Sequence, residues 1–177
     1  MAWAGADAVR YWLARLPAAR AGVLDRPAST ALHDGPPGPG KPFAAPPALA
    51  RELTAVRLAC ADAAATARWA AELGWAPAAP LPPGQLGHAA QIALLEELSW
   101  LAERVAGAAR RGQPAELPRY LERLAGAWLD CRENCPALPF GGRAAGRDAA
   151  AISARLWLAA AARTALSAGL DLIGVGP

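Results

Sequence analysis

The stretch from Ala48 to Leu73, ALARELTAVRLACADAAATARWAAEL, shows most clearly how this chain folds. Small and apolar side chains recur there at steps of three and four residues, and neither glycine nor proline interrupts them. The stripe consists of Leu49, Leu53, Val56, Cys60, Ala63 and Ala67. This period is typical of an amphipathic α-helix with one buried face, so the stretch predicts a long helix that ends near Gly74.

The composition extends this prediction to the whole chain. Its 177 residues are 54% hydrophobic but only 6% aromatic, and 49 of them are alanine. Alanine is the best helix former and a poor strand former, and the length suits one domain. We therefore expect a single all-α domain over residues 1–177, built as a bundle of five or more helices.

Four further helices are expected from apolar periodicity and from the positions of proline and glycine. They span about residues 3–23, 88–111, 114–133 and 148–173. The longest connecting loop, 26–47, contains seven prolines, which exclude a helix interior or a central strand.

The charges of the chain predict no nucleic-acid partner. The net charge is +3, and Lys41 is the single lysine among 18 basic residues. A dedicated nucleic-acid binder usually gathers its basic residues on one face or in one run. Here only Arg110 and Arg111 are adjacent, and acidic residues flank most of the others.

The most apolar stretch, Ala149 to Val175, is not expected to insert into a membrane. Arg155, Arg163 and Asp171 interrupt it, and three charges within one span disfavour a transmembrane helix. The N-terminal segment lacks the uninterrupted apolar run of a secretory signal. We therefore expect a cytoplasmic protein.

The three cysteines, Cys60, Cys131 and Cys135, are interpreted as core residues, because cysteine packs as a small hydrophobe and each continues an apolar stripe. The spacing of Cys131 and Cys135 leaves a redox or metal-binding role as the alternative. With His33 and His88 as the two histidines, a multi-histidine metal site is not expected.

No recognisable catalytic motif is present. The segment GGRAAG, Gly141 to Gly146, lacks the spacing and the preceding strand of a nucleotide-binding loop. The acidic residues between 96 and 133 fall on helix faces that point outward, as solvating rather than catalytic carboxylates do. The sequence therefore predicts a protein that is not an enzyme and that needs no cofactor.

Candidate partner-binding residues lie in the helix expected over 88–111. Trp100 falls on the charged face with Glu96 and Glu97, away from the leucine stripe. It is either covered by another helix or part of a recognition surface. His88 and Gln91 lie at the start of the same helix, where they either bond the preceding loop or contact a ligand.

The order of several of these features resembles the TorD/DmsD family of chaperones for molybdenum-containing oxidoreductases. The resemblance runs from the Gly-Pro-rich loop at Gly35, through a helix that ends at Leu73-Gly-Trp, to His88 at the start of a helix rich in leucine and glutamate. It ends at Leu170-Asp-Leu172. Such chaperones hold an apo-enzyme, and often its twin-arginine leader, until the molybdopterin cofactor is inserted.

The resemblance implies a cytosolic chaperone that binds an apo molybdopterin oxidoreductase or its signal peptide. His88 carries over from the family, and Gln91, Glu96, Glu97 and Trp100 are the expected neighbours in the partner-binding site. Two alternatives remain: a small non-catalytic subunit with a structural role in an oxidoreductase or other complex, and a redox or metal-binding bundle. The sequence leaves the oligomeric state open.

Overall fold

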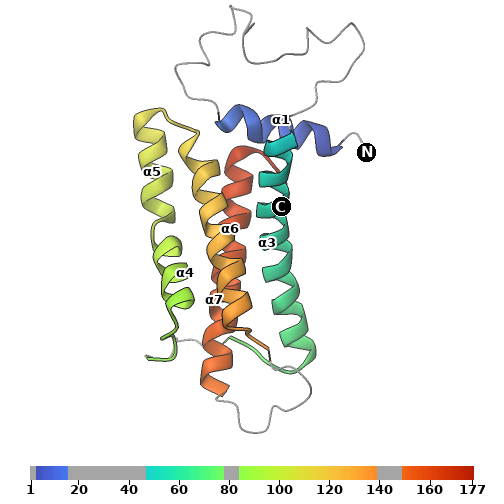
Figure 1. Cartoon of the computed structure of the whole chain (residues 1–177), viewed down its shortest axis with the longest axis vertical. Coiled ribbons are helices and arrows are strands. Elements are labelled where there is room, and N and C mark those ends of the chain that lie inside the picture. Colours follow the sequence, from blue (N-terminus) through green and yellow to red (C-terminus); the bar gives the residue numbers. More distant parts are fainter. Residues whose placement is uncertain (1–2, 16–46, 78–83, 139–148) are drawn as a thin grey trace, which may run out of the picture.

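A computed structural model describes residues 3–15, 47–77, 84–138 and 149–177. These residues form six α-helices and no strand, which confirms the predicted all-α bundle (Figure 1). The helices are α1 (Trp3–Arg15), α3 (Pro47–Glu72), α4 (Ala89–Ser99), α5 (Leu101–Arg111), α6 (Glu116–Asn134) and α7 (Ala149–Ile173). The predicted extension of the first helix to about Val23, and all but the last residue of the loop 26–47, lie outside the described residues.

Three long helices, α3, α6 and α7, lie side by side along the length of the molecule and enclose its main core (Figure 1). Helices α4 and α5 follow one another end to end beside α6, and α1 crosses one end of the bundle. The predicted stripe on α3 packs inward, with Leu53, Val56, Cys60 and Ala63 buried. Burial of this face stabilises the helix far more than its alanine content alone.

Glycine allows α6 and α7 to approach closely. A Cβ atom built on Gly169 of α7 would clash with Cδ2 of the fully buried Leu121 on α6. No real Cβ tolerates so short a contact, so Leu121 would have to move within a packed core. Gly169 is therefore required by the packing of the two helices.

Helix α7 is long and apolar enough to cross a membrane by length and composition, but this is weak evidence, since the core helix of a soluble protein meets the same criteria. In this fold α7 contacts α1, α3, α4 and α6. Leu158, Leu166 and Leu170 are among its buried side chains. Its apolar character is explained by its place in the bundle.

The single helix predicted over 88–111 is divided at Trp100 into α4 and α5. The hydroxyl of Tyr120, on α6, donates a hydrogen bond of 2.7 Å to the backbone carbonyl of Glu97, which also accepts from the Trp100 N–H. A side chain inserted in this way displaces the regular hydrogen bond of the helix and breaks it. The prediction of one continuous helix is therefore wrong at Trp100. The break is caused by Tyr120, which lies on another helix, so the local sequence does not reveal it.

All three cysteines are buried free thiols in the main core. Burial, followed by the neighbouring Cys135, raises the pKa of the Cys131 thiol to about 11. Burial also raises the pKa of Cys60. Within the described ranges, no group of three or more His, Cys, Asp or Glu side chains is arranged to hold a metal ion.

The close contact at Gly169 predicts opposite effects for two Gly→Ala substitutions. Gly169→Ala should lower the free energy of unfolding by about 1 kcal/mol or more, because overpacking costs more than the gain in helix propensity. Gly126→Ala, at an exposed position of α6 with open space around its Cβ, should raise it by about 0.5–1 kcal/mol. Urea unfolding of the three proteins measures both effects, and a stabilising Gly169→Ala would contradict the packing described.

The raised pKa of Cys131 predicts slow alkylation of the folded protein. Because the thiolate is the nucleophile, iodoacetamide should modify Cys131 slowly near pH 8 and faster only as the pH approaches 11. Peptide mass spectrometry at each pH measures the rate, with protein unfolded in urea as the fully reactive reference. Rapid modification of folded protein near pH 8 would instead indicate a reactive, redox-type thiol.

Candidate functional site

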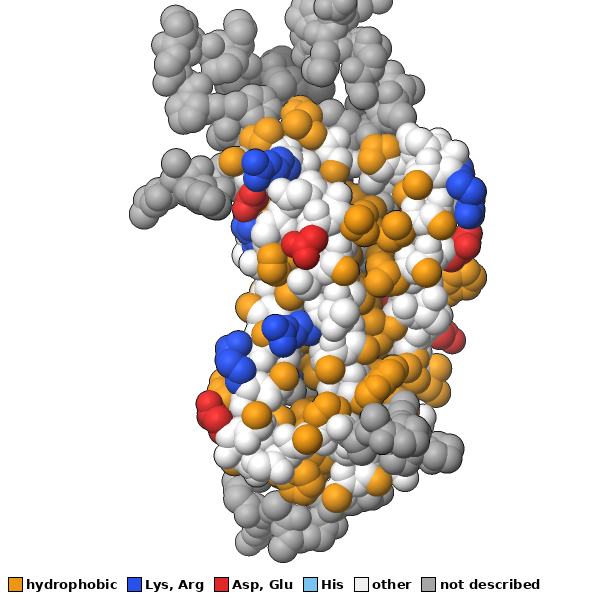
Figure 2. Space-filling model, turned by 180° about the vertical axis from the view of Figure 1, so that it is seen from behind, with side chains coloured by type: hydrophobic (Ala, Val, Ile, Leu, Met, Phe, Trp, Pro, Cys, Tyr) orange, Lys and Arg blue, Asp and Glu red, His pale blue; other side chains and the backbone are white. Residues whose placement is uncertain are grey.

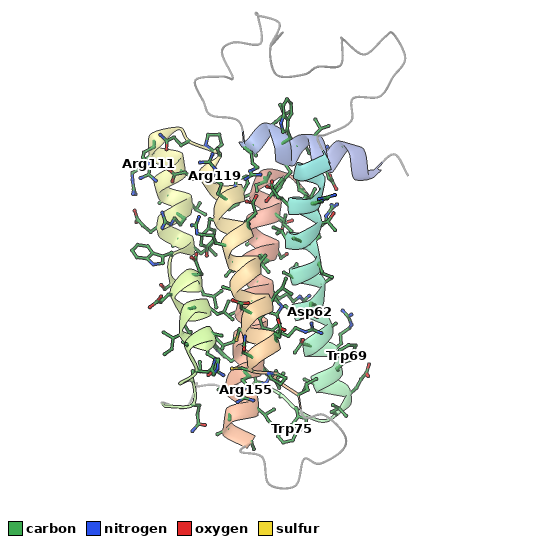
Figure 3. All side chains as sticks on the ribbon, in the orientation of Figure 1. Asp62, Trp69, Trp75, Arg111, Arg119 and Arg155 are labelled. Atoms are coloured by element: carbon green, nitrogen blue, oxygen red, sulfur yellow. The ribbon has the colours of Figure 1, made fainter. Side chains whose placement is uncertain are left out.

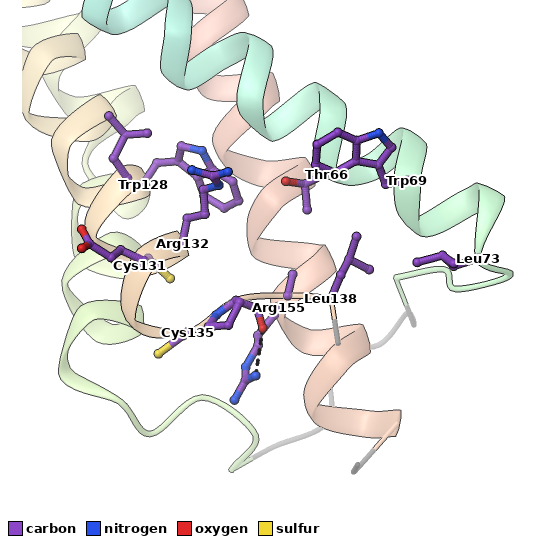
Figure 4. Close-up of a pocket in the computed structure, with 13 residues that line it drawn as sticks. Thr66, Trp69, Leu73, Trp128, Cys131, Arg132, Cys135, Leu138 and Arg155 are labelled. Carbon is purple, nitrogen blue, oxygen red and sulfur yellow. Dashed lines mark hydrogen bonds between the residues drawn. The ribbon is translucent and has the colours of Figure 1, made fainter. Parts of the chain in front are cut away.

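One cleft is lined by both aromatic and cationic side chains (Figure 4). It lies near the C-terminal ends of α3 and α6 and the N-terminal end of α7. It encloses about 700 Å³. Thr66 and Trp69 come from α3, with Leu73 just after it, and Arg155 comes from α7. Helix α6 and the segment after it supply Trp128, Leu129, Cys131, Arg132, Glu133, Cys135, Pro136, Ala137 and Leu138. We refer to this site as the α3–α6 cleft.

Two indole rings lie on opposite walls of the cleft. Trp69 is 54% exposed, although a tryptophan gains most by burial. Trp128 is only 2% exposed and forms part of the packed wall, with its ring nitrogen bonded to Asp62 of α3. Trp69 therefore offers an exposed ring surface, and the Trp128 ring opposite it is buried and held in place.

Two guanidinium groups line the same cleft. Arg132 is half-exposed, and its Nε lies 3.0 Å from Oδ2 of Asp62. Arg155 is partly buried, and its Nη1 donates a hydrogen bond of 3.1 Å to the carbonyl of Pro136 (Figure 4). Its Nε is buried without a hydrogen-bond partner among the described residues. Donors of this kind bind carbonyl and phosphate oxygens.

A small hydrophobic cluster closes the bundle beside the cleft. It consists of Ala70, Ala137, Ile152 and Leu156, with Trp75 and Leu138 packed against it. The hydroxyl of Ser153 donates to the carbonyl of Ala76 at 3.1 Å, which holds the segment after α3 against α7. The apolar cluster and this hydrogen bond therefore both hold the end of α3 that carries Trp69.

Two other hollows in the described part of the chain have a different character. One lies between α4 and α7 beside Trp157, and the other lies near the start of α6 and the end of α7. Apolar side chains line both, apart from Ser99 and Thr164. Figure 2, which views the molecule from behind, shows hydrophobic side chains gathered in a band along its length, with separate charged side chains beside this band. Neither hollow is lined by a charged side chain.

The α3–α6 cleft is suited to a flat aromatic ligand that carries hydrogen-bond acceptors. An exposed indole offers a stacking surface, and arginine offers directed donors and can itself stack on a ring. Unstacked nucleobases have both of these properties, and proteins commonly bind them on aromatic side chains and arginines.

The five residues predicted for partner binding do not line this cleft. His88 is the N-cap of α4: its Nδ1 accepts from the Ala90 N–H at 3.2 Å. Gln91 is buried, and its Oε1 accepts from the N–H groups of Gly87 and His88. Both side chains thus have a capping function, and a role in binding a partner stays a prediction.

The other three predicted residues lie in the second half of α4 and directly after it. Trp100 is 50% exposed at the break between α4 and α5, with the Arg104 guanidinium 5.6 Å from its ring centre. Glu97 pairs with Arg123 of α6 at 3.4 Å, and Glu96 is exposed. Their part in partner binding is likewise untested.

Sequence reasoning missed the residues of the cleft. It interpreted Cys131 and Cys135 as core residues, which they are, and it assigned no binding role to Trp69, Trp128 or Arg132. The available signal was that tryptophan and arginine recur near the ends of two helices, at Trp69 and at Trp128 with Arg132. Without the fold, nothing showed that these ends meet.

Comparison with known proteins identifies the family. Residues 70–177 match the family described as the DALR anticodon binding domain. The arginine–tRNA ligase of Paenarthrobacter aurescens is 33% identical over 175 residues, which cover 99% of this chain and 28% of the relative. That of Micrococcus luteus is 32% identical over 176 residues, 98% of this chain and 29% of the relative.

A third relative, the arginine–tRNA ligase of Frankia alni, is 38% identical over 90 residues, which cover 51% of this chain and 16% of the relative. The chain therefore spans less than a third of the length of these relatives. No solved structure matches the chain significantly.

These matches correct the predicted function. The resemblance to TorD/DmsD chaperones is wrong, and so is the chaperone for an apo molybdopterin oxidoreductase or its signal peptide. The alternative of a small structural subunit is not supported either. The prediction that the protein is not an enzyme is contradicted, because the relatives are ligases.

The exclusion of nucleic acid is wrong as well, because the matched family is described as binding an anticodon. The physical reason is that RNA bases are also recognised by pockets of aromatic and arginine side chains, which need no run of basic residues along the sequence. With a family match over more than half of its length and relatives aligned along nearly all of it, the chain belongs to the DALR anticodon-binding domain family.

Proposed function

We propose that the chain binds transfer RNA through its anticodon arm, and that it does so as the RNA-binding part of an arginine–tRNA ligase. The family description and the names of the relatives support this assignment. The cytoplasm, where aminoacylation supplies translation, is the proposed location.

The proposal depends above all on one observation: Trp69 and Arg132 line the same cleft. An anticodon base that leaves the loop stack can place its ring on the exposed indole, while Arg132 and Arg155 donate to its carbonyl oxygens or to the adjoining phosphate. The cavity of about 700 Å³ has room for one such base and part of its sugar.

The chain is proposed to contribute to the ligase reaction only through RNA binding. The chain spans 28% of the P. aurescens enzyme, and the described cleft provides binding groups. Its contribution to the reaction is therefore the selection and placement of the RNA, which changes the KM for tRNA more than the chemical step.

The proposal is tested with two tryptophans of similar exposure. Trp69→Ala should weaken binding of an arginine anticodon hairpin by about 1–3 kcal/mol, roughly 5- to 150-fold in Kd, because one stacking surface is lost. Trp100→Ala removes an equally exposed indole outside the cleft and should leave Kd nearly unchanged. Fluorescence anisotropy with a labelled hairpin measures both.

An anticodon hairpin from a tRNA for another amino acid serves as the RNA control, and it should bind the wild-type chain more weakly. Equal affinity for the two hairpins would contradict anticodon recognition. If Trp100→Ala weakened binding and Trp69→Ala did not, the RNA would bind on the α4–α5 side instead of in the cleft.

A further inference from the structure

We propose that Asp62 is a positioning residue, which holds the side chains that form the base-binding wall of the α3–α6 cleft. This inference rests on the proposed RNA-binding function. Asp62 does not itself line the cleft, yet it bonds three of the residues that do. Figure 3 shows it on α3, on the side that faces α6.

Two of the three contacts come from the Asp62 side chain and join α3 to α6, and the third lies within α3. Oδ2 of Asp62 accepts from Nε1 of Trp128 at 3.1 Å and lies 3.0 Å from Nε of Arg132. Its backbone carbonyl accepts from the hydroxyl of Thr66 at 3.0 Å. One carboxylate on α3 thus sets the position of two adjacent turns of α6.

The bond to Trp128 fixes the orientation of the indole ring. Trp128 is 2% exposed, so its N–H has no access to water and needs a protein acceptor. A buried donor left without an acceptor would favour another rotamer, and the aromatic wall would turn with it. The side chain of Asp62 is itself only 14% exposed, which strengthens both of its interactions.

The pair with Arg132 acts on a more mobile group. An arginine at a helix end samples many rotamers, and the bond between its Nε and Asp62 restricts it to those that keep the outer guanidinium nitrogens free beside the cleft. Binding then requires less ordering of this side chain, so the gain appears in affinity and in selectivity.

Because Asp62 carries a negative charge, a positioning role can be distinguished from a purely electrostatic one. If Asp62 acted only as a nearby negative charge, its removal would strengthen RNA binding through weaker repulsion of phosphate, without regard to the sequence of the loop. If it positions Trp128 and Arg132, its removal lowers the preference for the arginine anticodon. The two roles therefore predict changes of different kind.

The experiment compares the full chain with Asp62→Asn and Asp62→Ala. Each protein is titrated with the arginine anticodon hairpin and with the same hairpin carrying substituted anticodon bases. Asp62→Asn keeps an acceptor for Trp128 and loses the ion pair, so its ratio of the two affinities should fall about fivefold. Asp62→Ala loses both interactions, and its ratio should fall about twentyfold or more.

The matched control is Asp130→Asn, which removes the same charge from an exposed position on α6 that does not line the cleft. Its affinity ratio should equal that of the wild type. Arg132→Lys keeps the charge at an exposed site and loses the Nε contact, so it should reduce the ratio as Asp62→Asn does. The double variant should add little to either single change.

Each outcome is decisive. If both Asp62 variants fail to fold, as judged by circular dichroism, Arg132→Lys carries the test alone, and an unchanged ratio in that variant overturns the inference. If Asp62→Asn behaves as Asp130→Asn does, Asp62 has no positioning role, while the proposed function stands. If the wild-type chain binds neither hairpin, the proposed function fails and the inference fails with it.

Discussion

The close approach of α3, α6 and α7 is the constraint on which the rest of the structure depends. Alanine and Gly169 keep the helix surfaces thin where they meet, so that leucine side chains such as Leu121 and Leu166 fill the space between them. This packing explains why so alanine-rich a chain forms a defined bundle, since alanine favours the helix but contributes little apolar area of its own. It also leaves the remaining helices to be placed at the sides and at one end of the three-helix core.

The α3–α6 cleft lies among the same three helices. Toward one end of the bundle, Trp128 of α6 is packed into the cleft wall, while Trp69 of α3 stays exposed. Polar contacts there join α3 to α6 in addition to the apolar packing. Asp62 provides that connection through Trp128 and Arg132. The packed core and the cleft at its end are therefore formed by the same three helices.

The helices could be predicted from the sequence wherever local pattern and burial agree. The stretch 48–73 and the last helix were correctly predicted because period, composition and breakers indicate the same boundaries. The break at Trp100 could not be predicted, since Tyr120 causes it from another helix. The site was missed for a similar reason: Arg132 and Arg155 lie 23 residues apart in the sequence and meet only in the fold. The resemblance to a chaperone family misled because its local features, such as His88 with Gln91, have a capping role here.

The proposed binding of RNA in the α3–α6 cleft is tested most directly by photocrosslinking. An arginine anticodon hairpin with a photoreactive base in its loop would be crosslinked to the full chain, and the modified peptides identified by mass spectrometry. RNA bound in the cleft should crosslink within residues 66–75 and 128–138, which carry Trp69 and Arg132. Crosslinks confined to α4 and α5, around Trp100, would contradict binding in the cleft.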